Sequence, residues 1–129
     1  MAKQPVGGSQ PAGAYSPGIV AEGRFIYVSG QGPLRDGVVT GDTAEEQTRV
    51  VLGNLAAVLE SAGASLADVV RCGVFLADIG DFAAMDKAYS EAFPRPLSAR
   101  TTVGASLPGI LVEIDCVAVL PAATADLTP

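Results

Sequence analysis

The hydrophobic pattern of this chain changes repeatedly between the period of a strand and the period of a helix. Residues 24–32, RFIYVSGQG, are aromatic and β-branched and end in glycines, and residues 34–39, LRDGVV, carry the Asp-Gly signal of a hairpin. Two or three antiparallel strands are therefore predicted to open the fold. Residues 1–12 are rich in Gly, Pro, Ser and Gln, a composition that predicts a flexible N-terminal tail.

Two helices are predicted further along the chain. Asp42 or Thr43 can cap the first, since Thr43 and Glu46 have the spacing of a capping box, and Gly63 can end it. Its apolar residues recur at helical spacing and are Val51, Leu55, Val58, Leu59 and Ala62. Asp81 can cap the second helix, which two prolines end and whose apolar stripe is Phe82, Met85, Tyr89 and Phe93.

The other apolar runs predict strands. Residues 67–78, ADVVRCGVFLAD, form one run between the helices, and residues 97–120 form two more, joined by a Pro-Gly turn. The order of hairpin, helix, strand, helix and a closing pair of strands is an α+β pattern. Two helices can cover one face of this sheet, but several strands are apolar on both faces. A partner subunit is therefore expected to cover the second face.

Three charged residues interrupt the closing pair of strands: Arg100 in the first, and Glu113 and Asp115 in the second. Side chains alternate between the two faces of a strand. We assign one face to the helices, and its apolar positions are Val112, Ile114, Cys116 and Ala118. Glu113 and Asp115 then face the uncovered side, with Leu111 and Val117, and Asp115 is interpreted as solvated.

Arg100 near Glu113 has two interpretations. One is an exposed cross-strand ion pair, which contributes less than about 1 kcal/mol. The other is a functional site at the sheet edge or between subunits. There the planar guanidinium of Arg100 would bind a carboxylate through two hydrogen bonds, and Glu113 would orient or deprotonate a water molecule.

The composition narrows the chemistry of such a site. A chain of 129 residues is expected to form one domain, and its 17% of charged residues is low for a small monomer, which again favours an oligomer. The net charge of −6, without a cluster of Lys and Arg, argues against nucleic acid as a partner. The chain has no histidine, which removes imidazole catalysis and histidine-ligated metals, and no metal site is expected.

The two cysteines and the chain's first residues bear on its location. Cys72 and Cys116 are far apart and lack the Cys-x-x-Cys spacing of zinc and redox sites, so buried free thiols are predicted. The first residues lack the apolar core of a signal peptide, and no segment is long enough to cross a membrane. The resulting expectation is a soluble protein in the reducing cytoplasm, with no membrane partner.

Two further stretches, AYSPG and VSGQGP, place Tyr15 at the start of ordered structure and Ser29 and Gly30 at a strand end. A tyrosine before a turn most often serves packing, and Ser-Gly most often forms a turn. Alternatively, Tyr15 forms the wall of a small pocket, and the backbone N–H near Gly30 helps to bind an anion because glycine permits close approach.

Four stretches taken together resemble the RidA/YjgF family of enamine/imine deaminases: AYSPG, YVSGQGP, residues 45–93 and ARTTVGASLPGILVEIDCVAV. The resemblance covers about residues 13–120, which we take as a single RidA-like domain followed by a C-terminal tail, 121–129. It implies a chorismate-mutase-like α+β fold, with two helices on one face of a mixed sheet. It also implies a homotrimer whose sheets close into a central barrel, with active sites between neighbouring subunits.

The resemblance implies an activity of the 2-iminobutanoate/2-iminopropanoate deaminase type. Such a hydrolase converts 2-aminoacrylate, 2-iminopropanoate and similar compounds to 2-keto acids and ammonia without a cofactor. By the same resemblance, Arg100 binds the substrate carboxylate and Glu113 positions the attacking water. The positions that match the pocket lining are Tyr15, Ser29, Gly30 and Thr102, the last of which stands where some members have cysteine.

The chain departs from the typical deaminase pattern at three places. Proline is absent immediately before Ala99-Arg100, the stretch between Arg100 and Glu113 is shorter than usual, and Asp86 replaces a common asparagine in the second helix. An alternative therefore stays open, namely a non-enzymatic trimer that binds small carboxylates or acts as a chaperone. A ribonuclease role, sometimes attached to this family, is disfavoured by the acidity of the chain and its lack of histidine.

Overall fold

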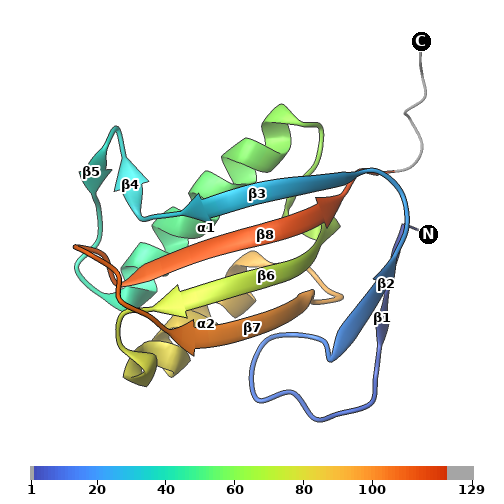
Figure 1. The fold of residues 1–129 in the computed structure, drawn as a ribbon, viewed down its shortest axis with the longest axis horizontal. Helices are drawn as coiled ribbons and strands as arrows, with labels where there is room; N and C mark the ends of the chain where they lie inside the picture. Colours follow the sequence, from blue (N-terminus) through green and yellow to red (C-terminus); the bar gives the residue numbers. More distant parts are fainter. Residues whose placement is uncertain (1, 122–129) are drawn as a thin grey trace.

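The central sheet consists of β3 (Phe25–Gln31), β6 (Val69–Leu76), β7 (Ala99–Gly104) and β8 (Val112–Val119). Their order in the sheet is β3-β8-β6-β7 (Figure 1). Strand β8 is antiparallel to both of its neighbours, whereas β7 is parallel to β6. The computed structural model describes residues 2–121, so the predicted C-terminal tail lies, after its first residue, outside the described residues.

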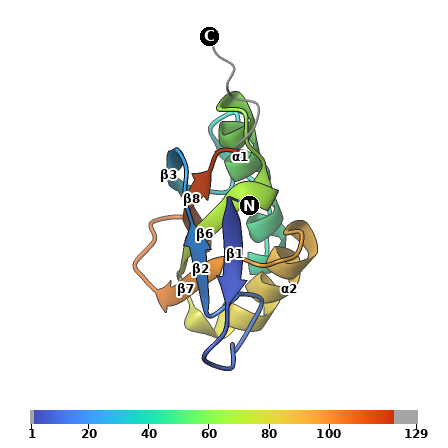
Figure 2. The ribbon, with the colours of Figure 1, turned by 90° about the vertical axis from the view of Figure 1, so that its right-hand side faces the viewer.

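Two helices, α1 (Ala44–Ser61) and α2 (Phe82–Ala92), lie on the same side of this sheet (Figure 2). Thr43 caps α1 through the predicted capping box, in which the Glu46 N–H donates to Thr43 Oγ1 at 3.1 Å and the Glu46 carboxylate accepts from the Thr43 N–H. Asp81 occupies the N-cap position of α2, as predicted, but its side chain makes no capping hydrogen bond. The mixed sheet and the two helices on one of its faces confirm the predicted α+β fold class. Two short 3-10 helices are η1 (Leu66–Asp68) and η2 (Ile79–Asp81).

The hydrophobic core lies between the helices and the sheet. On its helix side, α1 contributes Leu55 and Leu59, and α2 contributes Met85 and Tyr89, all without exposed surface. On the sheet side, every second residue along β6 and β8 is buried and packs against these helix residues. They include Cys72, Val74, Val112, Ile114, Cys116 and Ala118. This confirms the face that the sequence assigned to the helices.

The opposite face of the sheet is uncovered in a single chain and carries exposed apolar side chains. Phe25 and Tyr27 on β3 are 41% and 78% exposed, and Val103 on β7 is 41% exposed. Glu113 and Asp115 lie on this face with intermediate burial, so the predicted alternation along β8 is confirmed. Asp115 is more constrained than a solvated carboxylate, because its Oδ1 accepts the Gly73 N–H at 2.9 Å.

The predicted Asp-Gly hairpin is present and stands apart from the main sheet (Figure 1). It consists of β4 (Leu34–Arg35) and β5 (Val38–Val39), which pair antiparallel. Asp36 and Gly37 between them have positive φ values of 51° and 80°, the backbone that a two-residue hairpin turn requires.

The N-terminal segment differs from the flexible tail predicted for residues 1–12. It contains β1 (Lys3–Val6), which pairs antiparallel with β2 (Gly18–Ala21). The Lys3 ammonium also donates to the Val69 carbonyl at 2.8 Å, which ties this end of the chain to β6. Composition alone could not reveal the strand, because backbone pairing depends on a partner elsewhere in the chain.

The closing strands also differ from the predicted pair. β6 lies between β7 and β8, so the Pro-Gly stretch belongs to a connection between strands that are not neighbours. The reason is the crossover formed by α2, which returns the chain to pair β7 in parallel with β6, as strand-helix-strand units do. The residues before and after the Pro-Gly stretch are therefore separated by a whole strand.

Candidate functional site

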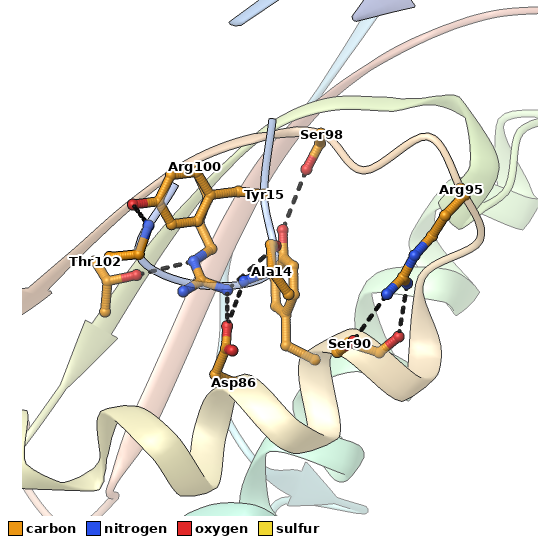
Figure 3. Close-up of polar contacts among 10 residues, drawn as sticks. Ala14, Tyr15, Asp86, Ser90, Arg95, Ser98, Arg100 and Thr102 are labelled. Carbon is orange, nitrogen blue, oxygen red and sulfur yellow. Dashed lines mark hydrogen bonds and ion pairs between the residues drawn. The ribbon is translucent and has the colours of Figure 1, made fainter. Parts of the chain in front are cut away.

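Arg100 is a buried arginine on the helix side of β7 (Figure 3). It lies opposite Cys72 in the β6-β7 register, and its side chain has no exposed surface. Its Nη1 donates to Asp86 Oδ1 at 2.8 Å and, at 3.4 Å, to the Ala14 carbonyl, and its Nε donates to Thr102 Oγ1 at 3.0 Å. Among residues 2–121, Nη2 is the one buried side-chain nitrogen or oxygen without a hydrogen-bond partner.

Aromatic rings surround the guanidinium of Arg100. Its central carbon lies 4.7 Å from the ring centre of Tyr89, 5.0 Å from that of Tyr15 and 5.3 Å from that of Phe82. A cation over aromatic faces is stabilised electrostatically, and the Asp86 carboxylate offsets part of the cost of removing the charge from water. The group is thus fixed in orientation before any ligand arrives.

The segment 11–16, which we call the N-terminal strap, covers this guanidinium. The Ala14 N–H donates to Asp86 Oδ1 at 2.8 Å, and the Ser16 hydroxyl donates to the Leu97 carbonyl at 2.6 Å. A Cβ on Gly13 would lie 2.8 Å from Asp86 Oδ1 and 3.0 Å from Arg100 Nη2, so the close approach requires glycine. Gly13 of the strap therefore packs directly against both Asp86 and the unpaired Nη2.

Glu113 lies on the opposite face of the sheet from Arg100. In the registers of β6 with its two neighbours, Cys72 is opposite both Arg100 and Cys116, so these three share the helix side. Glu113 is three residues from Cys116, which in a strand places it on the other face. The expected proximity of Arg100 and Glu113 within one chain is therefore wrong, because β6 separates their strands and their side chains point to different faces.

Glu113 belongs to a second cluster, formed with the end of β3. A Cβ on Gly30 would overlap the Glu113 carboxylate, so the carboxylate lies directly against the Gly30 backbone. Ser29 precedes Gly30 at an irregularity in the β3-β8 register and is exposed. The predicted site residues thus form two groups: Tyr15, Thr102 and Arg100 on one side of the sheet, and Ser29, Gly30 and Glu113 on the other.

Two buried or half-buried amides hold the segments next to the strands that carry the second cluster. Gln47 Oε1 accepts the Leu111 N–H at 2.8 Å, and its Nε2 donates to the Gly41 carbonyl at 3.0 Å. Asn54 Nδ2 donates to the carbonyls of Gly32 and Leu34, each at 2.9 Å. These amides therefore fix the residues that follow β3 and precede β8.

Asp86 is the site residue that the sequence reasoning did not assign to the site. The signal was present, because Asp86 is a carboxylate adjacent to Met85 and four residues after Phe82, at the border of the apolar stripe of α2. A charge at such a position usually has a buried partner. Its partner, Arg100, comes from a strand that follows α2 in the chain.

The thiols and the buried tyrosine beneath this site remain protonated. Cys72 and Cys116 are free and buried, as predicted. Burial raises the pKa of Cys72 to about 11 and that of Cys116 to about 12. Burial likewise raises the pKa of Tyr89, whose hydroxyl lies 3.1 Å from the Ser98 hydroxyl. A thiolate nucleophile is therefore disfavoured in this part of the core.

Comparison with known proteins identifies the family. The sequence model described as Endoribonuclease L-PSP matches residues 7–120. This chain belongs to the RidA/YjgF family. The match begins just after β1 and ends just after β8, so it includes the strap and the strands from β2 to β8.

Relatives and solved structures agree with this assignment. The protein is 43% identical to the mitochondrial protein mmf2 of Schizosaccharomyces pombe over 125 residues, covering 92% of this chain and 98% of that protein. It is 43% identical over 113 residues to a RutC family protein of Pyrococcus abyssi, covering 84% and 88% of the two chains.

Two solved structures from E. coli are similar to this fold. The YjgF gene product has 34% identity and a TM-score of 0.67 and covers 84% of this chain and 90% of its own. TdcF with bound serine has 30% identity and a TM-score of 0.71 and covers 91% and 94%. Within residues 2–121 of the present protein, no helix is long and apolar enough to span a membrane.

Proposed function

We propose that this protein hydrolyses reactive enamine and imine acids, such as 2-aminoacrylate and 2-iminopropanoate, to 2-keto acids and ammonia. The observation that carries the proposal is the Nη2 group of Arg100, a buried donor with no hydrogen-bond partner among the described residues. A buried donor left unsatisfied costs about 1–3 kcal/mol, so a ligand acceptor at this position is favoured. A carboxylate is the acceptor that matches a guanidinium best.

The proposed active site is completed by a neighbouring subunit. Arg100 belongs to β7 at one edge of the sheet, and Glu113 lies beside Gly30 of β3 at the other edge. If three sheets close into a barrel, β7 of one subunit comes beside β3 of the next, which brings Arg100 of one chain toward Glu113 of another. The exposed Phe25, Tyr27 and Val103 on the uncovered face support this homotrimer, which would bury them.

In the proposed mechanism Arg100 fixes the carboxylate of an α-imino acid, with Tyr15 and Thr102 around the guanidinium. Glu113, against the backbone of Gly30 and near Ser29, orients a water molecule and accepts one of its protons as the water oxygen bonds to the imine carbon. The electron pair of the C=N double bond moves to nitrogen, which takes up that proton to give a carbinolamine. Transfer of the hydroxyl proton to nitrogen then breaks the carbon–nitrogen bond, forms the keto C=O and releases ammonia with the 2-keto acid. An enamine enters the same route after tautomerising to the imine. Orientation of two reactants suffices here, because imines hydrolyse readily.

The test generates 2-aminoacrylate in situ with a PLP-dependent dehydratase and follows the release of pyruvate. We expect wild type to accelerate release over solvent, and both Arg100→Lys and Glu113→Gln to lose most of that acceleration. Arg100→Lys keeps the charge but not the planar fork, and Glu113→Gln keeps the shape but not the base. The proposal is wrong if wild type gives no acceleration, or if both variants match it.

A second candidate is a non-enzymatic trimer that binds small carboxylates or unfolding clients. One observation favours it: Asp86 pairs with Arg100 at 2.8 Å and so offsets much of the charge that would attract a substrate. This candidate predicts that calorimetry detects carboxylate binding that depends on Arg100 while keto acid release stays at the solvent rate. The cytoplasmic location also stays a prediction, since the S. pombe relatives mmf1 and mmf2 carry mitochondrial names.

A further inference from the structure

Asp86 uses one of its two carboxylate oxygens to hold the site together. Oδ1 accepts both the Ala14 N–H and the Nη1 of Arg100, each at 2.8 Å. The side chain is 24% exposed, in contrast to the fully buried Arg100 side chain. A carboxylate has about four acceptor positions in total, so Asp86 retains the capacity to bind a further donor.

The Asp86 carboxylate lies close to the nitrogen that a ligand of Arg100 would have to reach. A Cβ on Gly13 would lie 2.8 Å from Asp86 Oδ1 and 3.0 Å from Arg100 Nη2, so the carboxylate oxygen and the unpaired nitrogen are near neighbours. A ligand carboxylate bound at Nη2 therefore comes close to a second negative charge. Like charges this close disfavour binding unless the ligand also brings a donor or a positive charge to Asp86.

α-Imino and α-amino acids carry such a group, because their nitrogen is on the carbon next to the carboxylate. The nitrogen of an amino acid is an ammonium, and that of an imino acid carries an N–H that becomes positively charged on protonation. A 2-keto acid has only lone pairs at the corresponding oxygen, which would face the Asp86 carboxylate. The two ligand classes thus differ at the atom nearest to Asp86.

We propose that Asp86 is a specificity-determining residue that accepts a hydrogen bond from the nitrogen of a bound α-imino or α-amino acid and thereby selects against 2-keto acids. The inference deepens the proposed function and rests on Arg100 as its carboxylate-binding group. With Asp86 in this role, the site favours substrates that carry an α-nitrogen and readily releases the 2-keto acid product, which lacks one. The serine bound to the related TdcF is an α-amino acid, in agreement with this ligand class.

The test is isothermal titration calorimetry of the full-length protein with L-alanine and pyruvate, which share a three-carbon skeleton. We expect wild type to bind L-alanine more tightly than pyruvate. Asp86→Asn should lower this preference by about tenfold or more, because it removes the charge but keeps an oxygen for Ala14 and Arg100. A purely structural role for Asp86 would change both affinities by the same factor. Thermal unfolding of Asp86→Asn checks that the fold is retained.

Each outcome supports or overturns the inference. An unchanged ratio of the two affinities in Asp86→Asn overturns it, as does a wild type that binds neither ligand or prefers pyruvate. Unchanged binding in Arg100→Ala also overturns it, since the ligands would then lie elsewhere. If the preference depends on Asp86 while 2-aminoacrylate is not turned over, recognition stands and the hydrolytic function fails. If turnover occurs without any role of Asp86 in the preference, the hydrolytic function stands alone.

Discussion

Arg100 and Glu113 lie on opposite faces of the same sheet, with β6 between their strands. Arg100 is enclosed by Asp86 and three aromatic rings beneath the N-terminal strap, whereas Glu113 lies against Gly30 on the uncovered face. A single chain thus holds the two halves of the proposed site apart. An interface between subunits is the arrangement that would bring them together.

This arrangement predicts complementation between inactive variants. Arg100→Ala and Glu113→Gln should each be inactive alone, but mixed trimers contain some interfaces with both wild-type residues. For random assembly of equal amounts in a cyclic trimer, about a quarter of the sites are intact. We therefore expect co-expressed variants to recover about a quarter of the wild-type rate of keto acid release.

The control for this experiment is the double variant Arg100→Ala/Glu113→Gln co-expressed with Arg100→Ala, in which no interface has both residues. Activity should be absent there. Absence of recovery in the first mixture, with mixed trimers verified by mass spectrometry, would show that the two residues do not act across an interface.

The contact between Gly30 and Glu113 makes a separate prediction. Gly30→Ala places a methyl group where the Glu113 carboxylate lies, and the flexible end of that side chain can turn away. We expect the rate of keto acid release to fall by about tenfold or more, because the water would lose its orientation. The free energy of unfolding in urea should change by less than about 1 kcal/mol, since no backbone is displaced.

Gly53→Ala is the matched control for Gly30→Ala. Gly53 lies within α1, is exposed, and an added Cβ would have no described atom within 4 Å. Alanine there should leave activity unchanged and raise the free energy of unfolding by up to about 1 kcal/mol through helix propensity. Equal activity in both alanine variants would contradict the role proposed for the Gly30 contact.

The features predicted correctly from the sequence are those set by neighbouring residues. The capping box of Thr43 and Glu46, the stripe containing Leu55 and Leu59, and the Asp-Gly hairpin all depend on spacing within a few residues. The faces of β8 were also correct, because alternation along one strand is local. The family motifs suggested candidate site residues without giving their distances.

The features predicted wrongly depend on which strands become neighbours. β1 was missed because its partner, β2, had not been recognised as a strand. The closing strands were expected to pair, but α2 returns the chain so that β7 adds to β6. The same pairing decides that Arg100 faces the helices, so its separation from Glu113 followed from topology that spacing along the chain does not encode.

Gln47 makes a third testable prediction, concerning stability. Its side chain is 4% exposed and bonds both the Leu111 N–H and the Gly41 carbonyl. Gln47→Ala leaves both backbone groups unpaired, and we expect the free energy of unfolding to fall by about 1–3 kcal/mol. Activity should fall as well, because Leu111 precedes the strand that carries Glu113. Glu60→Ala, on the exposed side of α1, serves as the control and should stay within about 0.5 kcal/mol of wild type.

The buried thiols predict how stability depends on pH. Burial raises the pKa of Cys72 from 9.0 to about 11 and that of Cys116 to about 12. Above pH 9 the unfolded chain releases these protons while the folded chain keeps them, so the unfolded state is increasingly favoured. The stability that the thiols contribute is therefore fully present below pH 9 and is lost as the pH rises through 11 and 12.

Urea unfolding at pH 8, 9 and 10 can measure this loss against the double variant Cys72→Ala/Cys116→Ala. The variant starts from a lower stability because it loses buried volume, so the comparison uses the slope of the free energy of unfolding against pH. Tyr89 is present in both proteins, and burial, the main cause of its raised pKa, acts in both; Cys72 raises this pKa further in wild type alone, which adds to the steeper decline expected there. We expect a clearly steeper decline for wild type above pH 9. Parallel declines would mean that the thiols are accessible enough to titrate in the folded protein as they do in the unfolded chain.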